Sequence, residues 1–217
     1  MTAKIVGVIA SRTDLRRALR MRKPPDFFEL RLDQLVNCLD ELNRAISRLP
    51  APLVLTARDP HEGGGHNLSI QRRRTLLLKF LPAAAWLDIE LRSANSLRPL
   101  LRSARAAGIR TITSFHDFEQ TPSSDRLDEM LAAARSLGTD IFKIATRTDT
   151  PDQLARLLHF FERQRGTPSV VAMGIGKLGR RSRFALARRG CALNYGHLGT
   201  PATAGQLSIS ELRRASH

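Results

Sequence analysis

The sequence is poor in aromatic residues and has no long apolar run. Aromatic side chains make up 5% of its 217 residues, with one tryptophan and one tyrosine, so few platforms exist on which the bases of a single nucleic-acid strand could stack. No stretch of about 18 or more uninterrupted apolar residues occurs, which argues against a transmembrane helix. Residues 1–10 show neither the long apolar stretch nor the small-residue cleavage site of a secretory signal. We therefore expect a cytoplasmic protein.

Cysteine is also scarce. The two cysteines, Cys38 and Cys191, match no spacing that is typical of a metal or redox site. We expect free thiols in a reducing cytoplasm, with a disulfide as the alternative.

Acidic residues are few, and the chain carries a formal net charge of +15. The basic excess is nearly all arginine. A charge of this size indicates anionic partners, either nucleic acid or small acids. The arginines are scattered over predicted helical faces, which favours solvated surfaces over a nucleic-acid-binding surface. They include Arg16, Arg17, Arg20, Arg98, Arg102, Arg105, Arg188 and Arg189.

Short β-branched apolar runs alternate with longer amphipathic stretches along the whole chain. The predicted strands are residues 4–10, 27–32, 52–57, 85–91, 110–115, 140–145, 168–173 and 191–195. The predicted helices are residues 14–21, 34–49, 70–80, 96–107, 124–137, 151–163 and 180–189, with a last one from near Ser208. Helix starts are indicated at Ser123 and Thr150, and helix ends at Gly108 and Gly138.

Strict alternation of strand and helix predicts a parallel sheet. Eight such units in a chain of this length favour a closed barrel, so we expect an α/β protein with a single (β/α)₈ TIM-barrel domain over residues 1–217. An open, doubly wound sheet is the alternative.

Charged residues gather where the predicted strands end, and this is the edge at which such barrels build their active sites. Because side chains alternate along a strand, Glu29, Arg31 and Asp33 share one face, as do Asp88 and Glu90. Arg58 and His116 follow other strands, in the segments 56–58 and 114–117. Buried charges are costly unless they are paired or functional, so these residues are candidate site residues.

Lys143 lies within the apolar strand over residues 140–145. Alternation turns Phe142 and Ile144 outward and Lys143 inward. Partial burial lowers the pKa of a lysine and frees a neutral amine, which attacks carbonyl groups to form a Schiff base. Two alternatives stay open: a rim lysine in a misassigned strand, or a buried salt bridge to Glu90 or Asp88.

His116 follows the neighbouring strand. Imidazole takes and returns a proton near neutral pH, so His116 is a candidate general acid and base. A purely structural histidine is the alternative.

Two glycine-rich stretches follow predicted strands. Residues 62–65 place Glu62 before three glycines, which indicates a mobile loop whose glutamate could reach the site. Residues 174–179 match the pattern GxGxxG, but no acidic residue occurs between Glu162 and Glu211, so a dinucleotide site is excluded. The turn and the following Arg180, Arg181 and Arg183 form a candidate anion site.

Together, these segments resemble class I 3-dehydroquinate dehydratase, the Schiff-base type. The matching segments are residues 29–33, 56–58 with 62–64, 88–90, 114–118, 142–145, 173–179 with 182–183, and 205–206. Each motif alone is weak, but seven in register over nearly the whole chain are specific.

The resemblance implies a (β/α)₈ barrel, a homodimer, no metal and no cofactor. It implies a hydro-lyase of the shikimate pathway of aromatic amino acid biosynthesis that converts 3-dehydroquinate, a small carboxylate, to 3-dehydroshikimate. Lys143 would form the imine, His116 would move the proton, and Glu62 would support His116. The implied substrate-binding residues are Glu29, Arg31, Arg58, Arg183 and Gln206, with Arg183 and Gln206 on the carboxylate.

The chain departs from the family pattern at several positions. Ala202 stands where a substrate-binding serine is common, and Thr203 is its possible substitute. Tyr195 stands where phenylalanine is usual, and Val8 where a small residue is usual. The chain also lacks the N-terminal hairpin of longer members. These changes bear on substrate affinity and lid closure rather than on the core chemistry.

Three rival functions stay open at this point. The first is another Schiff-base barrel of the class I aldolase kind, with a phosphate site near Gly176 and Gly179. The second is a basic nucleic-acid-binding protein, and the third is a barrel that keeps the fold with little activity.

Overall fold

Eight strands and eight α-helices alternate in the part of the chain that the structure, a computed structural model, describes, namely residues 3–164, 166 and 169–215. The strands are β1 (Lys4–Ile9), β2 (Phe27–Arg31), β3 (Leu53–Thr56), β4 (Trp86–Glu90), β5 (Arg110–Asp117), β6 (Ile141–Arg147), β7 (Ser169–Ile175) and β8 (Leu193–His197). The helices are α1 (Arg12–Leu19), α2 (Leu39–Ala45), α3 (Ile70–Phe80), α4 (Arg98–Ala106), α5 (Ser124–Ser136), α6 (Pro151–Arg163), α7 (Gly179–Arg188) and α8 (Ile209–Ala215).

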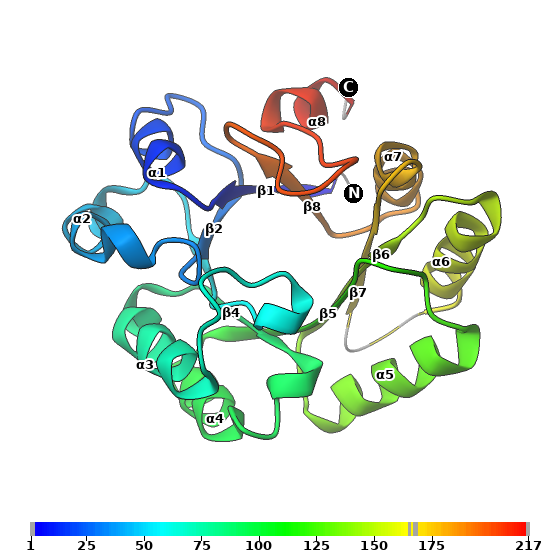
Figure 1. The fold of residues 1–217 in the computed structure, drawn as a ribbon, viewed down its shortest axis with the longest axis horizontal. Coiled ribbons are helices and arrows are strands. Elements are labelled where there is room, and N and C mark those ends of the chain that lie inside the picture. The colour runs from blue at the N-terminus through cyan, green and yellow to red at the C-terminus, as the bar shows by residue number, and fades with distance from the viewer. Residues whose placement is uncertain (1–2, 165, 167–168, 216–217) are drawn as a thin grey trace.

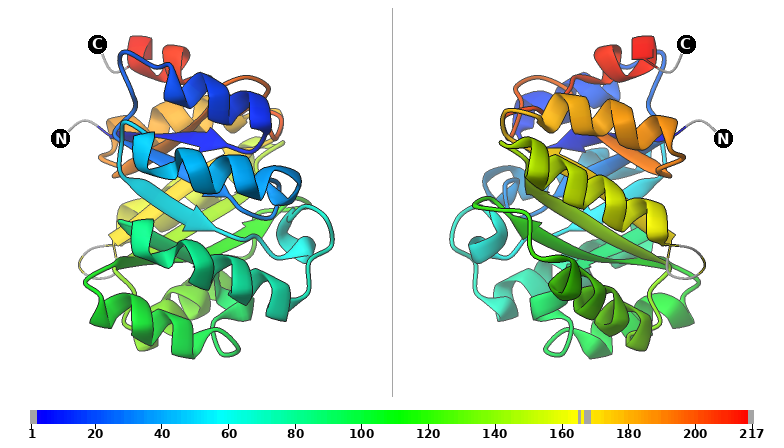
Figure 2. Two further views of the ribbon diagram at one scale, coloured as in Figure 1. Left: turned by 90° about the vertical axis from the view of Figure 1, so that its left-hand side faces the viewer. Right: turned by 90° about the vertical axis from the view of Figure 1, so that its right-hand side faces the viewer.

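All the strand pairs are parallel, and the strands follow one another in the order β7-β6-β5-β4-β3-β2-β1-β8. The pairing of β8 with β1 brings the last strand beside the first, so the sheet curls into a nearly closed barrel. The helices surround it on the outside (Figures 1 and 2). A doubly wound sheet reverses its strand order at a switch point, and this order has no such reversal. The predicted TIM barrel is therefore confirmed.

Local signals in the sequence set several helix ends. The side chains of Ser123 and Thr150 accept hydrogen bonds from backbone N–H groups in the first turns of α5 and α6, and Gln153 completes a capping box with Thr150. Gly108 and Gly138 follow α4 and α5 with φ angles of 72° and 66°, a left-handed conformation that glycine adopts without steric cost. The predicted helix starts and ends are confirmed at these positions.

Alternation along the strands separates the core from the site. Leu30, Leu55 and Leu87 turn outward and are fully buried against the helices, where they share a cluster with Leu76 and Leu101. The residues between them turn inward, so the polar positions of β2, β3 and β4 face the barrel interior at its carboxyl end. Outward burial of apolar side chains thus fixes which charged residues point inward.

One predicted helix is wrong. Residues 34–49 form a 3₁₀ turn (Val36–Cys38), the seven-residue α2 and a second 3₁₀ turn (Ile46–Arg48) instead of one long helix. Cys38 has a φ of −142°, far from helical geometry, and asparagine and cysteine at positions 37 and 38 have low helix propensity. The apolar residues of this segment do recur at helical spacing, but the backbone departs from an α-helix at two places within the segment.

Three strands run farther than their apolar pattern predicts. β5, β6 and β7 continue to Asp117, Arg147 and Ile175 because backbone pairing continues, for example between His116 and Ala145 and between Thr146 and Gly174. In β5 and β6, polar residues end the apolar pattern but not the ladder, and His116 from the β5 extension lines the cavity. This extension carries His116 on the strand itself rather than on a loop.

Other predictions from composition are met. Cys38 and Cys191 are both buried and unpaired, so the disulfide alternative is wrong. All eight scattered arginines of the predicted helical faces are exposed. Within residues 3–164, 166 and 169–215, no helix has the length and apolar character needed to cross a membrane.

Candidate active site

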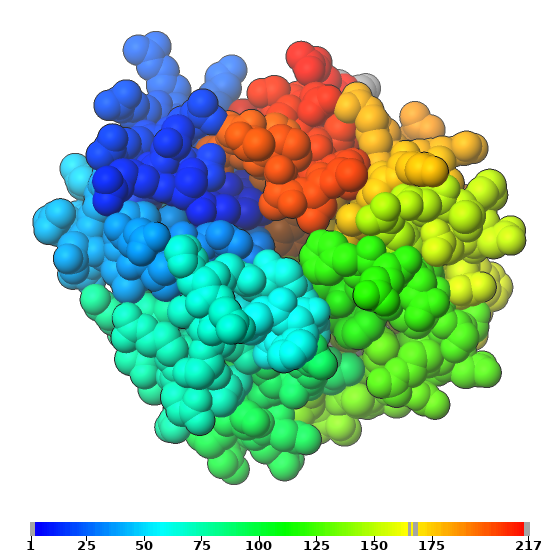
Figure 3. All heavy atoms as spheres, viewed as in Figure 1, coloured from blue at the N-terminus to red at the C-terminus, as the bar shows by residue number. Residues whose placement is uncertain are grey.

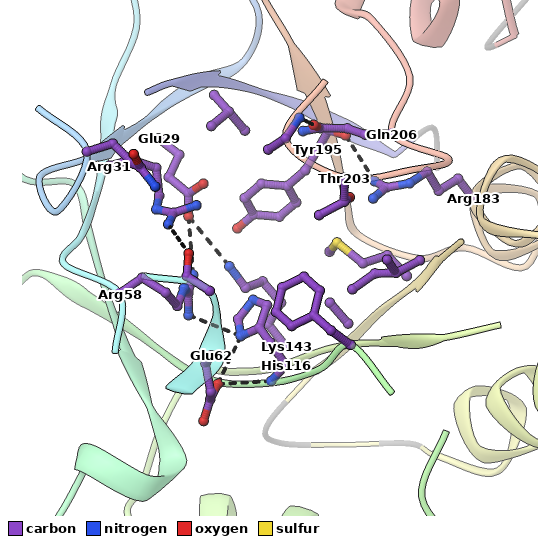
Figure 4. Close-up of a pocket in the computed structure, with 18 residues that line it drawn as sticks. Glu29, Arg31, Arg58, Glu62, His116, Lys143, Arg183, Tyr195, Thr203 and Gln206 are labelled. Atoms are coloured by element: carbon purple, nitrogen blue, oxygen red, sulfur yellow. Dashed lines mark hydrogen bonds and ion pairs between the residues drawn. The ribbon is translucent and has the colours of Figure 1, made fainter. Parts of the chain in front are cut away.

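A cavity of about 220 Å³ opens at the carboxyl ends of the strands. Figure 3 shows this end of the barrel, with a hollow near its centre between the segments that follow β3, β5 and β8. All eight predicted site residues line the cavity: Glu29, Arg31, Arg58, Glu62, His116, Lys143, Arg183 and Gln206. Val8, Tyr195, Ala202 and Thr203 line it as well (Figure 4).

Lys143 projects from the middle of β6 into this cavity, with its side chain only 3% exposed. Its Nζ lies 2.5 Å from Oδ2 of Asp88 and 3.6 Å from Oε1 of Glu29. The interpretation of Lys143 as a rim residue is therefore wrong, and the salt-bridge partner is Asp88. Glu90 instead pairs with Arg73 at 2.8 Å. Lys143 thus has two carboxylates beside its amine, with Asp88 the nearer, and it lines the cavity.

Asp88 is a fixed negative charge beside the amine. Burial alone would raise its pKa, but the charges of Lys143 and Arg58 and a hydrogen bond from Ser114 lower the pKa to about 2. Asp88 therefore stays ionised at neutral pH. It balances a positive charge at Nζ and does not take protons from it.

Arg58 is the central cation of a buried network. Its guanidinium donates to Oγ of Ser114 at 2.6 Å and lies 3.3 Å from Glu90, 3.4 Å from Asp88 and 3.7 Å from Glu29. Burial acts against its charge, but these three carboxylates raise the pKa of Arg58 above its ordinary value. Arg58 is therefore held as a buried cation among three carboxylates.

Arg73 is a supporting residue that the sequence pattern did not single out. It projects from α3 into the core with 2% exposure and donates to Glu90 at 2.8 Å and to Asp59 at 2.6 Å. It also donates to Ser93. The available signal was its position one turn before Leu76 and Leu77 on the buried face of α3. An arginine on an apolar helical face needs buried acceptors, and Glu90 is one.

His116 and Glu62 form a pair on the opposite side of Lys143 from Tyr195. Oε2 of Glu62 lies 3.0 Å from Nδ1 of His116 and accepts the backbone N–H of His116 at 2.9 Å. Glu62 reaches this position from a short 3₁₀ turn (Pro60–Glu62) that reverses at Gly63, whose φ is 81°. Arg58 also lies 3.3 Å from Nδ1. Glu62 thus lies in the wall of the cavity.

Burial shifts the pKa values of both Glu62 and His116. It raises the pKa of Glu62 to about 8, although Arg58 opposes the shift. Burial and the charges of Arg58, Lys143 and Arg31 lower the pKa of His116 well below its ordinary value. When Glu62 is ionised, Nδ1 of His116 carries the proton and Nε2 is a free base. When Glu62 is protonated, it donates to Nδ1, and Nε2 carries the proton as an acid.

The raised pKa of Glu62 predicts a pH-dependent stability. The unfolded chain releases this proton near the ordinary glutamate pKa, whereas the native protein keeps it up to about pH 8. Native protein thus binds more protons in this range, and its free energy of unfolding falls as pH rises. Between about pH 5 and pH 8, the free energy of unfolding of Glu62→Gln should therefore fall by about 1–3 kcal/mol less than that of the unchanged protein. Urea unfolding at several pH values measures this difference.

Glu129→Gln is the matched control, because Glu129 is exposed on α5 and, within the described part of the chain, pairs with Arg126 on the same helix. This control should follow the pH dependence of the unchanged protein. Parallel curves for Glu62→Gln and the unchanged protein would show that the proton affinity of Glu62 is ordinary.

The far side of the cavity is built to hold an anion. Arg183 from α7 is buried, donates to the backbone oxygen of Tyr195 at 3.0 Å, and has an Nε without a hydrogen-bond partner among the described residues. Burial lowers the pKa of Arg183 to about 10, so it stays cationic at neutral pH. Gln206 accepts the N–H of Ala202 through Oε1, so its NH₂ group is the end of the amide that can donate to a ligand. A carboxylate suits these donors.

The predicted anion site needs one correction. Of its three arginines only Arg183 lines the cavity, because Arg180 and Arg181 turn to the surface of α7 and Arg180 pairs with Glu211. The helical period separates them: Arg183 lies one turn after Arg180, but Gly179, Ser182, Arg183 and Leu186 form the buried face.

The remaining predicted residues shape the wall. Arg31 makes two hydrogen bonds to Asp33, at 3.0 and 2.8 Å, and a third to the oxygen of Gly63, so it ties β2 to the loop that carries Glu62. Thr203 lies in the wall next to Ala202 and supplies a hydroxyl where the alanine has none. Among the described residues, no group of three or more His, Cys, Asp or Glu side chains is arranged to hold a metal ion.

Residues 6–217 match the model of the family described as Type I 3-dehydroquinase. The 3-dehydroquinate dehydratase of Pyrococcus abyssi is 33% identical over 190 residues, which cover 87% of this chain and 85% of that one. The enzyme of the same name from Thermococcus onnurineus is 30% identical over 213 residues, 97% and 96% of the two chains. The solved structure of 3-dehydroquinate dehydratase from Enterococcus faecalis superposes with a TM-score of 0.84 at 27% identity and covers 99% of this chain and 93% of that one. A match of this extent, on a barrel with this site, means that the chain belongs to the Type I 3-dehydroquinase family.

Proposed function

We propose that this protein is a 3-dehydroquinate dehydratase, a hydro-lyase that removes water from 3-dehydroquinate to give 3-dehydroshikimate. The observation that carries the proposal is the buried amine of Lys143, which lies between the His116–Glu62 pair and the anion-binding side chains of Arg183 and Gln206 in one cavity. This arrangement suits a substrate with both a ketone and a carboxylate. It supports the shikimate pathway as the setting.

Three sides of the cavity fix the orientation of the substrate. Its carboxylate would bind Arg183 and Gln206, and its ring hydroxyls would meet Glu29, Arg31 and Arg58 on the opposite side. Figure 4 shows these two groups facing each other across the cavity with Lys143 between them. A ketone placed between a carboxylate and ring hydroxyls therefore lies over Nζ of Lys143.

The imine forms when the neutral amine of Lys143 attacks the ketone and the resulting carbinolamine loses water. The iminium nitrogen is positively charged. Asp88, whose pKa of about 2 keeps it ionised, lies beside this nitrogen, as it lay beside the amine before the reaction. Its charge therefore stabilises the cation that draws electrons from the neighbouring carbon. This makes the C–H bond next to the iminium acidic.

His116 would then remove the proton through Nε2 while Glu62 is ionised. The C–H electron pair moves into the ring to form an enamine, and Nδ1 passes its proton toward Glu62 as Nε2 gains one. The enamine expels the hydroxyl group at the carboxylate-bearing carbon, and His116 returns the proton so that water leaves. The raised pKa of Glu62 and the lowered pKa of His116 favour this exchange of roles.

The aldolase-like alternative requires a phosphate site in the turn after β7, and the turn does not offer its amides. The N–H groups of Gly176, Lys177, Leu178 and Gly179 already donate to protein oxygens. The acceptor of the Lys177 N–H is the carboxylate of Asp149 at 2.7 Å, which would repel a phosphate. This turn supports α7 and Arg183 instead.

An absorbance assay tests the proposal. 3-Dehydroshikimate is a conjugated enone that absorbs in the ultraviolet, whereas 3-dehydroquinate has an isolated ketone. We expect the absorbance to rise when the protein meets 3-dehydroquinate. No rise would contradict the proposal and would mean that the barrel has another function. Nucleic-acid binding that weakens steeply with salt would then become the leading alternative.

The single domain over residues 1–217, the homodimer and the cytoplasmic location stay predictions. We also propose the roles of the eight site residues on the geometry above, since their placement in one cavity supports them.

A further inference from the structure

Tyr195 is the one tyrosine of the chain, and its hydroxyl group makes no hydrogen bond with the described residues. It lies on β8 with 4% exposure, and its Oη is buried without a hydrogen-bond partner among the described residues. Nearly all buried polar groups in native proteins are hydrogen-bonded. A buried hydroxyl of a residue that lines a cavity, with no partner in the described part of the chain, indicates that its partner is a ligand.

The position of this hydroxyl in the cavity indicates which group of the substrate it contacts. The ring of Tyr195 packs on the amine of Lys143, with Nζ 4.5 Å from the ring centroid. Beyond the amine, the hydroxyl points toward the side of the cavity where Glu29 lies (Figure 4). It points away from Arg183 and Gln206, so it does not serve the carboxylate.

The hydroxyl acts as a donor. Burial, Glu29 and Asp88 raise the pKa of Tyr195 well above its ordinary value, so the phenol stays neutral. A neutral phenol beside carboxylates would donate its proton to an oxygen. No carboxylate oxygen of the described residues accepts a hydrogen bond from this hydroxyl, and the iminium nitrogen on Lys143 has no lone pair to accept one. A substrate oxygen near the ketone is therefore the acceptor that fits.

We propose that Tyr195 donates a hydrogen bond to the substrate hydroxyl on the carbon next to the ketone, on the side away from the carbon that loses the proton. This inference rests on the proposed function, since it requires the ketone at Lys143 and the carboxylate at Arg183. With those two groups fixed, the carbon that loses the proton lies toward Arg183, and the hydroxyl-bearing neighbour lies toward Glu29. Tyr195 is thus a specificity-determining residue for a hydroxyl group vicinal to the ketone.

Tyr195→Phe tests this role because it removes only the hydroxyl and keeps the ring over Lys143. The contact exists before and during the reaction, so its loss should raise KM with little change in kcat. We expect kcat/KM for 3-dehydroquinate to fall by about three- to tenfold, the usual effect of losing one uncharged hydrogen bond. The variant should unfold no more easily than the unchanged protein, since the lost hydroxyl has no partner in the fold.

The matched control is Thr113→Val. Thr113 also buries a hydroxyl without a partner among the described residues, but it lies on β5 and does not line the cavity. This control should leave KM unchanged. A second comparison uses a substrate analogue that lacks the hydroxyl next to the ketone. The unchanged protein should turn it over with a raised KM, and Tyr195→Phe should have no further effect on it.

These measurements distinguish a failure of the role proposed for Tyr195 from a failure of the proposed function. If the unchanged protein turns over 3-dehydroquinate but Tyr195→Phe matches it, or lowers kcat/KM equally for both substrates, the role of Tyr195 is wrong and the proposed function stands. If the unchanged protein has no activity, the proposed function itself is wrong and this inference falls with it.

Discussion

Lys143→Ala should end catalysis and covalent labelling together. We expect a fall in turnover of at least about 10⁴-fold, the scale on which enzymes lose activity with their nucleophile. The amine is the group in the cavity that can condense with a ketone, and its neighbours Asp88, Glu29 and Arg58 cannot replace it. Borohydride reduction in the presence of 3-dehydroquinate should add mass to the peptide that contains Lys143 in the unchanged protein and to none in the variant.

Lys177→Ala is the control, because this exposed lysine lies near the same end of the barrel but outside the cavity. It should keep both activity and label. Loss of the Lys143 ammonium leaves Asp88 with Arg58 at 3.4 Å and Ser114 at 2.5 Å, so the fold has a remaining partner for the buried charge. Circular dichroism of Lys143→Ala and of the bulkier Lys143→Met checks this. Label on Lys177, or label that survives in a folded Lys143 variant, would disprove the mechanism.

His116→Ala should block the step after imine formation. We expect kcat to fall by about 10²- to 10⁴-fold, the usual contribution of a general acid–base group, while Lys143 still reacts. Mass spectrometry after borohydride reduction separates the two steps. The variant should carry the adduct of unreacted 3-dehydroquinate, which is heavier by one water than the adduct of the dehydrated product.

His159→Ala controls for the loss of a histidine, since His159 is exposed on α6, away from the cavity. It should turn over as the unchanged protein does. A His116→Ala variant that forms the dehydrated adduct at the usual rate would show that another group removes the proton. A variant with no adduct would show that His116 is needed earlier, for the imine itself.

The sequence predicts the architecture well because the fold depends on repeated local patterns. Short apolar runs that alternate with amphipathic stretches determine eight strands, and caps such as Thr150 and stops such as Gly108 determine helix ends. Where the backbone leaves helical geometry at Cys38, or where a strand continues past its apolar run to Asp117, local patterns predict the wrong boundary.

Site residues on strands are predictable for the same reason. Period-2 alternation alone turns Lys143 and Glu29 inward, and the cavity contains both. Arg180 and Arg183 show where such reasoning fails. They lie one helical turn apart after the same strand, and only the way α7 packs on the barrel decides that Arg183 enters the cavity while Arg180 pairs with Glu211.

The amino-acid sequence by itself determined the order of strands and helices and the face of each strand on which a charged side chain lies, because both follow from local periodicity. Only the tertiary structure decided which charges meet. Curling of the sheet sets Asp88, not Glu90, against Lys143 and brings Glu62 to His116 across 54 positions of the chain. It also leaves the hydroxyl of Tyr195, in the cavity wall, without a partner among the residues that the structure describes. Distances across a barrel depend on closure, twist and loop path, and no pattern along one strand encodes them.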